Sequence, residues 1–140
     1  LDDLSKKKHI NSVFLALGMV KNINQRKELI NKISKYKFNF PNFFSKNSLV
    51  SKNLKIGYGN IIMHQSLINR NVNLGNFNII NNRSLIEHDV IIGSNVHIST
   101  GAIINGNVKI GNNVFIGSGA VITNNKTIKS NTFIKAGQVL

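Results

Sequence analysis

Residues 84–122 read SLIEHDVIIGSNVHISTGAIINGNVKIGNNVFIGSGAVI, and a branched aliphatic residue returns at every sixth position of this stretch. The same period continues in both directions, so that sixteen consecutive positions from Val50 to Leu140 each hold Val, Ile or Leu. Two positions before the aliphatic residue, the side chain is often small or β-branched. A glycine often follows it directly, as at Gly75 and Gly93.

A period of six favours short strands separated by tight turns, with one large aliphatic side chain per hexad pointing inward. The small residue two places earlier lies on the same face, because side chains in a strand alternate. Three hexads close a triangular coil, and fifteen steps then predict about five coils that bury one continuous apolar column. The sequence therefore predicts an all-β parallel solenoid. The alternative is an Asn-rich low-complexity tract, which the unbroken period argues against.

Residues 1–47 have a different pattern from residues 48–140, and we expect two domains with this boundary. The apolar run 13–17 predicts a buried strand, and 25–33 carries apolar residues at helical spacing. Residues 36–40 alternate like a second strand, which Pro41 ends. A strand, a helix and a strand predict the last part of a small α/β domain, whose first part we expect upstream of Leu1.

Composition excludes several classes of protein. With no cysteine among 140 residues, a disulfide scaffold, a zinc-thiolate site and a cysteine acyl-enzyme are all excluded. No run approaches the roughly 20 apolar residues of a membrane helix, and the start has no signal-peptide layout, so we expect a cytoplasmic protein without a membrane partner. The net charge of +13 suits phosphorylated small molecules. Aromatic and basic residues do not interleave, so we expect no nucleic-acid partner.

The histidines provide the candidates for chemistry. His9 lies among lysines and is interpreted as a surface residue. His64 and His88 lie at turns, and His97 follows His88 by half a coil, so these imidazoles do not converge within one chain and we predict no metal. His88 lies between Glu87 and Asp89, and a carboxylate beside an imidazole makes it a better general base. The alternative is an exposed histidine with incidental acidic neighbours.

Three features together resemble one family. They are the Ile-Glu-His-Asp corner at 86–89, the second histidine nine residues later, and Gly-Asn-Val-Lys-Ile-Gly at 106–111. The chain resembles the hexapeptide acyltransferases that include sialic acid O-acetyltransferases and UDP-4-amino-sugar N-acetyltransferases. That resemblance implies a left-handed parallel β-helix preceded by a nucleotide-sugar-binding domain. It also implies a homotrimer whose active sites lie between adjacent subunits.

The resemblance also implies roles for individual residues. His88 corresponds to the general base and Asp89 to the carboxylate that supports it. The positions that correspond to acetyl-CoA contacts are His97, Gly106, Ser118 and Ala136, and those near the sugar substrate are Gly18 and Asn81. The expected reaction is acetyl transfer from acetyl-CoA, without a metal, to an amino or hydroxyl group of a nucleotide-activated sugar or sialic acid for surface glycans.

Two other functions stay open from the sequence. One is a hexapeptide acyltransferase with a different small acceptor, such as serine or an antibiotic. The other is a β-helical structural protein without catalysis, in which His88, Asp89 and His97 are ordinary surface residues. The sequence does not distinguish N-acetylation from O-acetylation.

Overall fold

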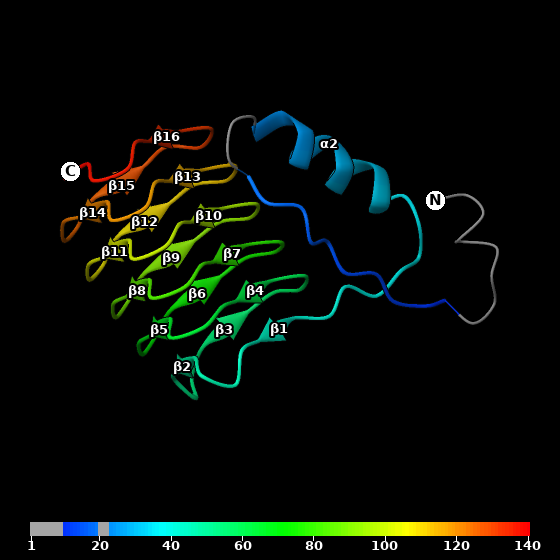
Figure 1. Cartoon of the computed structure of the whole chain (residues 1–140), viewed down its shortest axis with the longest axis horizontal. Coiled ribbons are helices and arrows are strands. Elements are labelled where there is room, and N and C mark those ends of the chain that lie inside the picture. Colours follow the sequence, from blue (N-terminus) through cyan, green and yellow to red (C-terminus); the bar gives the residue numbers. More distant parts are fainter. Residues whose placement is uncertain (1–9, 20–22) are drawn as a thin grey trace.

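The computed structural model describes residues 10–19 and 23–140 as a stack of parallel coils with one helix beside it (Figure 1). The helix is α2, Ile23–Ile33. The segment 10–19 and α2 lie along one side of the stack. The coils are built of two-residue strands, which form three sheets.

Each sheet takes every third strand along the chain. The first sheet contains β1 (Phe43–Phe44), β4 (Ile61–Ile62), β7 (Ile79–Ile80), β10 (His97–Ile98), β13 (Phe115–Ile116) and β16 (Phe133–Ile134). The second sheet contains β2 (Leu49–Val50), β5 (Leu67–Ile68), β8 (Leu85–Ile86), β11 (Ile103–Ile104) and β14 (Val121–Ile122). The third sheet contains β3 (Lys55–Ile56), β6 (Asn73–Leu74), β9 (Ile91–Ile92), β12 (Lys109–Ile110) and β15 (Thr127–Ile128).

The register of the sheets follows the hexad repeat. Every strand pairs in parallel with a strand 18 residues away, as Ile80 pairs with Ile98 and Ile98 with Ile116. Eighteen residues are three hexads, so one coil contains one strand of each sheet. The predicted left-handed parallel β-helix of hexapeptide repeats, with about five coils, is confirmed.

The second residue of each strand points into the stack. From Ile62 to Ile134 these aliphatic side chains are at most 8% exposed, and those of the first and second sheets are at most 2% exposed. The small residues two places earlier share this interior, including Val90 and Ala102, which are fully buried. Val50 and Ile56, in the first coil, are only partly buried. The hydrophobic column predicted from the repeat is therefore the core of the protein.

Asparagine occupies many of the turn positions that need a left-handed backbone conformation. Most residues with positive φ outside glycine are asparagines, such as Asn71, Asn107 and Asn125, with φ between 58° and 63°. Asparagine adopts this left-handed conformation more readily than most residues. Gly75 is required for lack of space and not for its φ, because a Cβ there would lie 2.6 Å from the carbonyl oxygen of Gly93 in the next coil. Turn geometry thus explains part of the asparagine content, and its regular spacing is not typical of a low-complexity tract.

The region before the β-helix differs in part from its prediction. The helix is confirmed, but the two predicted strands are wrong: among the described residues before β1, the one β-bridge is a parallel bridge between Ser12 and Asn39. The run 13–17 is also not buried throughout, since Phe14 and Leu17 are more than 40% exposed. Packing on the β-helix holds this segment instead of a sheet, because the buried Leu15 belongs to a cluster with Ile33 and Phe77.

The boundary between residues 47 and 48 stays a prediction. The ladder of the first sheet already begins at β1, which pairs with β4. His9 lies outside the described residues.

Candidate active site

The three outer faces of the β-helix differ in what covers them. The outward residues of the first sheet are apolar or aromatic, and the middle ones, Ile79, His97 and Phe115, are at most 8% exposed. Met19 donates a backbone hydrogen bond to His97, so the segment 10–19 covers part of this face. The outward residues of the third sheet are all exposed, and they are Lys55, Asn73, Ile91, Lys109 and Thr127.

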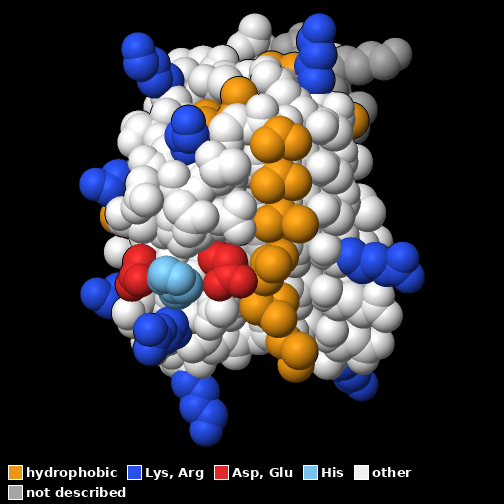
Figure 2. Space-filling view, turned by 90° about the vertical axis from the view of Figure 1, so that its left-hand side faces the viewer, with side chains coloured by type: hydrophobic (Ala, Val, Ile, Leu, Met, Phe, Trp, Pro, Cys, Tyr) orange, Lys and Arg blue, Asp and Glu red, His pale blue; other side chains and the backbone are white. Residues whose placement is uncertain are grey.

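The second sheet carries an apolar face that no described residue of the chain covers. Its outward residues are aligned by the strand register into one column, the aliphatic stripe: Leu49, Leu67, Leu85, Ile103 and Val121. Figure 2 shows the stripe running along the molecule, with a histidine between two acidic side chains beside it. Among the described histidines only His88 has acidic neighbours on both sides in the sequence, Glu87 and Asp89.

His88 and Asp89 form a hydrogen-bonded pair at the turn after β8. The imidazole Nδ1 lies 2.8 Å from Asp89 Oδ2, and 47% of each side chain is exposed. Because the ionised carboxylate only accepts hydrogen bonds, it holds the proton of a neutral imidazole on Nδ1 and leaves Nε2 as the basic nitrogen. The hydrogen bonds from His88 and Asn71 lower the pKa of Asp89, so its carboxylate is ionised at neutral pH.

Gly106 lies one coil further along, directly against this imidazole. A Cβ at Gly106 would lie 2.8 Å from Cε1 and 3.0 Å from Nε2 of His88. Glycine therefore leaves the space in which the basic nitrogen sits. The three predicted residues His88, Asp89 and Gly106 form one group.

His97 and Asn81 form a second group, on the first sheet. The amide nitrogen of Asn81 lies 3.4 Å from His97 Nε2, and both residues line a cavity of about 350 Å³ with Gly18. The rest of the lining is apolar and comprises Phe14, Ala16, Phe43, Ile61, Met63 and Ile79. His97 points outward from its strand as predicted, but Met19 covers it and leaves it 5% exposed. The sequence did not reveal this cover.

Arg26 attaches the covering segment to the β-helix. Its buried guanidinium donates hydrogen bonds to the carbonyl oxygens of Leu17 and Phe77, both at 2.7 Å, and to the side chain of Asn95. Burial lowers the pKa of Arg26 to about 10, so it stays charged at neutral pH. This charged side chain of α2 joins the segment 10–19 to two coils of the β-helix. The cavity lined by Gly18, Asn81 and His97 therefore depends on it.

Acid is expected to loosen the segment 10–19. Burial, together with the charge of Arg26, lowers the pKa of His97 to about 4 from 6.5. Between these values the detached state binds a proton that the packed state does not, so packing weakens as pH falls through this range, by up to about 3 kcal/mol. Protonated Nδ1 also cannot accept the Met19 N–H. Hydrogen exchange should show less protection of Met19 at pH 5 than at pH 7.

The variant His97→Gln is the control for that measurement, since glutamine does not titrate. Its protection is expected to be independent of pH once the intrinsic exchange rates are divided out. Equal protection of the unaltered protein at both pH values would contradict the role of His97.

Ser118 and Ala136 form a third group, at the turns between the first and second sheets. They are exposed and lie one coil apart, with the Gly137 N–H bonded to the Ser118 carbonyl oxygen at 2.9 Å. His88 and Gly106 occupy the turns on the other side of the second sheet. The first and third groups thus lie along opposite edges of the aliphatic stripe and do not meet within one chain, whereas the second group lies at the first sheet.

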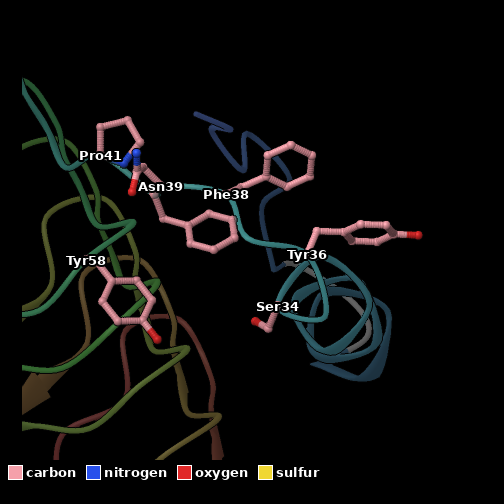
Figure 3. A pocket seen from close by; sticks show the side chains of 7 residues that line it. Ser34, Tyr36, Phe38, Asn39, Pro41 and Tyr58 are labelled. Carbon is pink, nitrogen blue, oxygen red and sulfur yellow. The ribbon is translucent and has the colours of Figure 1, made fainter. Parts of the chain in front are cut away.

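Other features of the described residues do not form a reactive centre. A hollow of about 480 Å³ lies beside the segment after α2, with Tyr58 on one side and Ser34 and Tyr36 on the other (Figure 3). Its lining contains no acid, histidine or lysine. Within residues 10–19 and 23–140, no cluster of three metal-ligating side chains occurs, and no helix is long and apolar enough to cross a membrane.

Comparison with known proteins shows which proteins this chain is similar to. The family model described as bacterial transferase hexapeptide (six repeats) matches residues 89–124. No curated protein sequence matches the chain.

Solved structures extend the similarity to the whole chain. PerB of Caulobacter crescentus, in complex with CoA and GDP-perosamine, is 27% identical, with a TM-score of 0.88 over 94% of this chain and 62% of its own. The acetyltransferase domain of PglB from Neisseria gonorrhoeae is 26% identical, with a TM-score of 0.89 over 99% of this chain and 68% of its own. The same domain in complex with acetyl coenzyme A is 28% identical, with a TM-score of 0.83 over 90% of this chain and 60% of its own.

The expected similarity to bacterial sugar acetyltransferases is therefore confirmed. The chain spans about three fifths of the length of the perosamine N-acetyltransferase.

Proposed function

We propose that this hexapeptide-repeat protein transfers an acetyl group from acetyl-CoA to an amino or hydroxyl group of a nucleotide-activated sugar or sialic acid for surface glycans. The observation that carries the proposal is the His88–Asp89 pair against Gly106, which presents a basic nitrogen in open space. The relatives add the substrate class, since PerB holds CoA and GDP-perosamine and the PglB domain holds acetyl coenzyme A. The net charge of +13 suits both phosphorylated substrates.

In this reaction the acceptor attacks the thioester carbonyl directly. His88 Nε2 takes the proton from the attacking amine or hydroxyl, a bond forms to the acetyl carbon, and the C–S bond breaks to release CoA, which receives the proton. Asp89 keeps the imidazole in the required tautomer and orientation. The backbone N–H of Gly106, which bonds to no described residue, is our candidate donor to the oxyanion.

We further propose a homotrimer in which the aliphatic stripe is the contact surface. The first sheet is partly covered by the segment 10–19 and the third sheet is mostly polar, so we assign the contact with another subunit to the apolar column of the second sheet. Cyclic symmetry closes such a contact and brings one edge of the stripe beside the opposite edge of a neighbour. His88 of one subunit would then face the edge of the next subunit that carries Ser118 and Ala136. We assign this edge, together with His97, to the binding of acetyl-CoA.

The remaining residues would serve the acceptor. Gly18 and Asn81 line the cavity on the first sheet, and we assign them to the sugar. Residues 1–47 would belong to the nucleotide-binding unit and 48–140 to the acetyl-transferring unit. The cytoplasmic location expected from the sequence stays a prediction.

The test is a thiol-release assay on the full-length protein with acetyl-CoA. The acceptors are UDP-4-amino-sugars, GDP-perosamine and sialic acid, each compared with serine and with no acceptor. We expect release of CoA with at least one sugar and not with serine. If none of these acceptors causes release of CoA, the result would support a structural protein. Release only with a non-sugar acceptor would support a different acyltransferase.

A further inference from the structure

The carboxylate of Asp89 is the end of a side-chain ladder that runs through the two preceding coils. Asn71 lies 18 residues before Asp89, and its Nδ2 donates to Asp89 Oδ1 at 3.0 Å. Asn53 lies another 18 residues before, and its Nδ2 donates to Asn71 Oδ1 at 2.7 Å. The two oxygens of Asp89 are thus divided, with Oδ1 toward Asn71 and Oδ2 toward His88.

The direction of this ladder is determined by a backbone N–H, which can only donate. The backbone N–H of Asn71 donates to Asn53 Oδ1 at 3.3 Å, and the hydroxyl of Ser51 donates to the same oxygen at 2.7 Å. Asn53 therefore presents its NH₂ group to Asn71, whose oxygen must face it. Asn71 in turn has only its NH₂ group left for Asp89, which as an ionised carboxylate accepts it.

We propose that Asn71 is a positioning residue for the acetyl transfer, acting through Asp89 on the orientation of the His88 imidazole, and that Asn53 fixes the orientation of Asn71. The proposal rests on the proposed function, because the His88 orientation matters to the rate only if His88 is the base. Asp89 sits at an exposed turn with φ of 61°. One bond to His88 leaves its carboxylate free to rotate, and the second bond to Asn71 removes that freedom.

Other charged groups around Asp89 do not replace this bond. Arg70 acts on the carboxylate only through its charge and makes the smallest contribution to lowering the Asp89 pKa. The Glu87 carboxylate has a different partner from Asp89, since it accepts a hydrogen bond from Asn69 at 3.0 Å. Asn71 is the second hydrogen-bond donor to Asp89 beside His88.

The chain contains a matched ladder away from His88. Asn95 donates to Asn113 at 2.9 Å, and Asn113 donates to Asn131 at 3.3 Å. Asn113 is thus the middle member of three, as Asn71 is, and both have positive φ, 56° and 58°. Glycine adopts this conformation without strain, so Asn71→Gly and Asn113→Gly remove the same amide at the same backbone geometry.

The experiment compares these two variants, with Asn53→Gly as a third. Asn71→Gly is expected to raise the Asp89 pKa, measured by NMR of the carboxyl carbon, because the carboxylate loses a donor. It is also expected to lower kcat by about threefold to tenfold, a small part of what misplaced catalytic groups cost, with the KM for acetyl-CoA unchanged. Asn53→Gly should shift both quantities less, and Asn113→Gly should leave the Asp89 pKa unchanged.

An unchanged Asp89 pKa in Asn71→Gly, or an equal rise of this pKa in Asn71→Gly and Asn113→Gly, would overturn the proposal. The NMR measurement needs no substrate. A raised Asp89 pKa in a protein that transfers no acetyl group would therefore refute the proposed function and not the ladder, whereas active protein with an unmoved pKa would refute the ladder alone.

Discussion

Replacing His88 with alanine is expected to lower kcat by about 10²–10⁴-fold, the usual contribution of a general base. The fold should survive, because 47% of the side chain is exposed and its loss opens no cavity. We expect the free energy of unfolding to change by no more than about 0.5 kcal/mol. The KM for acetyl-CoA should move little, since His88 is not assigned to bind it. Initial rates of thiol release and thermal melting measure these quantities.

His64→Ala is the matched control, since His64 is also an exposed histidine two residues after a buried isoleucine. Its kcat is expected to equal that of the unaltered protein. Asp89→Asn should cost less than His88→Ala, because the base remains and asparagine accepts the same positive φ. A His88→Ala protein with normal melting and nearly unaltered kcat would refute the mechanism and leave the activity resting on similarity alone.

The β-helix was predictable because its rule is local and repeated. One aliphatic residue per hexad is enough to place every inward side chain from Ile62 to Ile134, and each hexad confirms its neighbours. The pairing of His88 with Asp89 was predictable for the same reason, because adjacent residues at one turn stay close in any register. Residues 18 apart lie in the same position of adjacent coils, so the repeat also indicates that Asn71 lies beside Asp89 and Gly106 beside His88.

The surroundings of His97 could not be predicted in this way. They depend on where residues 10–19 pack, and Met19 is 78 residues away from His97 in the chain. The apolar run 13–17 indicates a strand by pattern, but contacts of Leu15 with Phe77 and the binding of Arg26 by Leu17 and Phe77 decide its position. These contacts follow no period, so the sequence shows an apolar segment without showing its partner.

The aliphatic stripe makes the second strong prediction: Leu85→Lys should convert the protein from trimer to monomer and abolish most of its activity. Leu85 lies in the middle of the stripe, so three copies of the new cation would be buried together at the proposed interface. An unpaired charge taken out of water is strongly unfavourable. The matched control is Ile91→Lys, because Ile91 points outward from the third sheet and is 45% exposed.

Leu85 and Ile91 both lie three residues from His88, one before and one after it, so a direct effect of the new charge on the imidazole is similar in the two variants. They differ in that Leu85 belongs to the aliphatic stripe and is partly buried in the single chain, whereas Ile91 is exposed on the third sheet. Light scattering at micromolar concentration should give three times the 15.5 kDa chain mass for the unaltered chain and for Ile91→Lys, and a single chain mass for Leu85→Lys. Thiol release should fall with the trimer, because His88 loses the Ser118 and Ala136 edge of its neighbour. A monomeric unaltered protein, or a trimeric Leu85→Lys, would mean that the stripe is not the interface and that the site is complete within one chain.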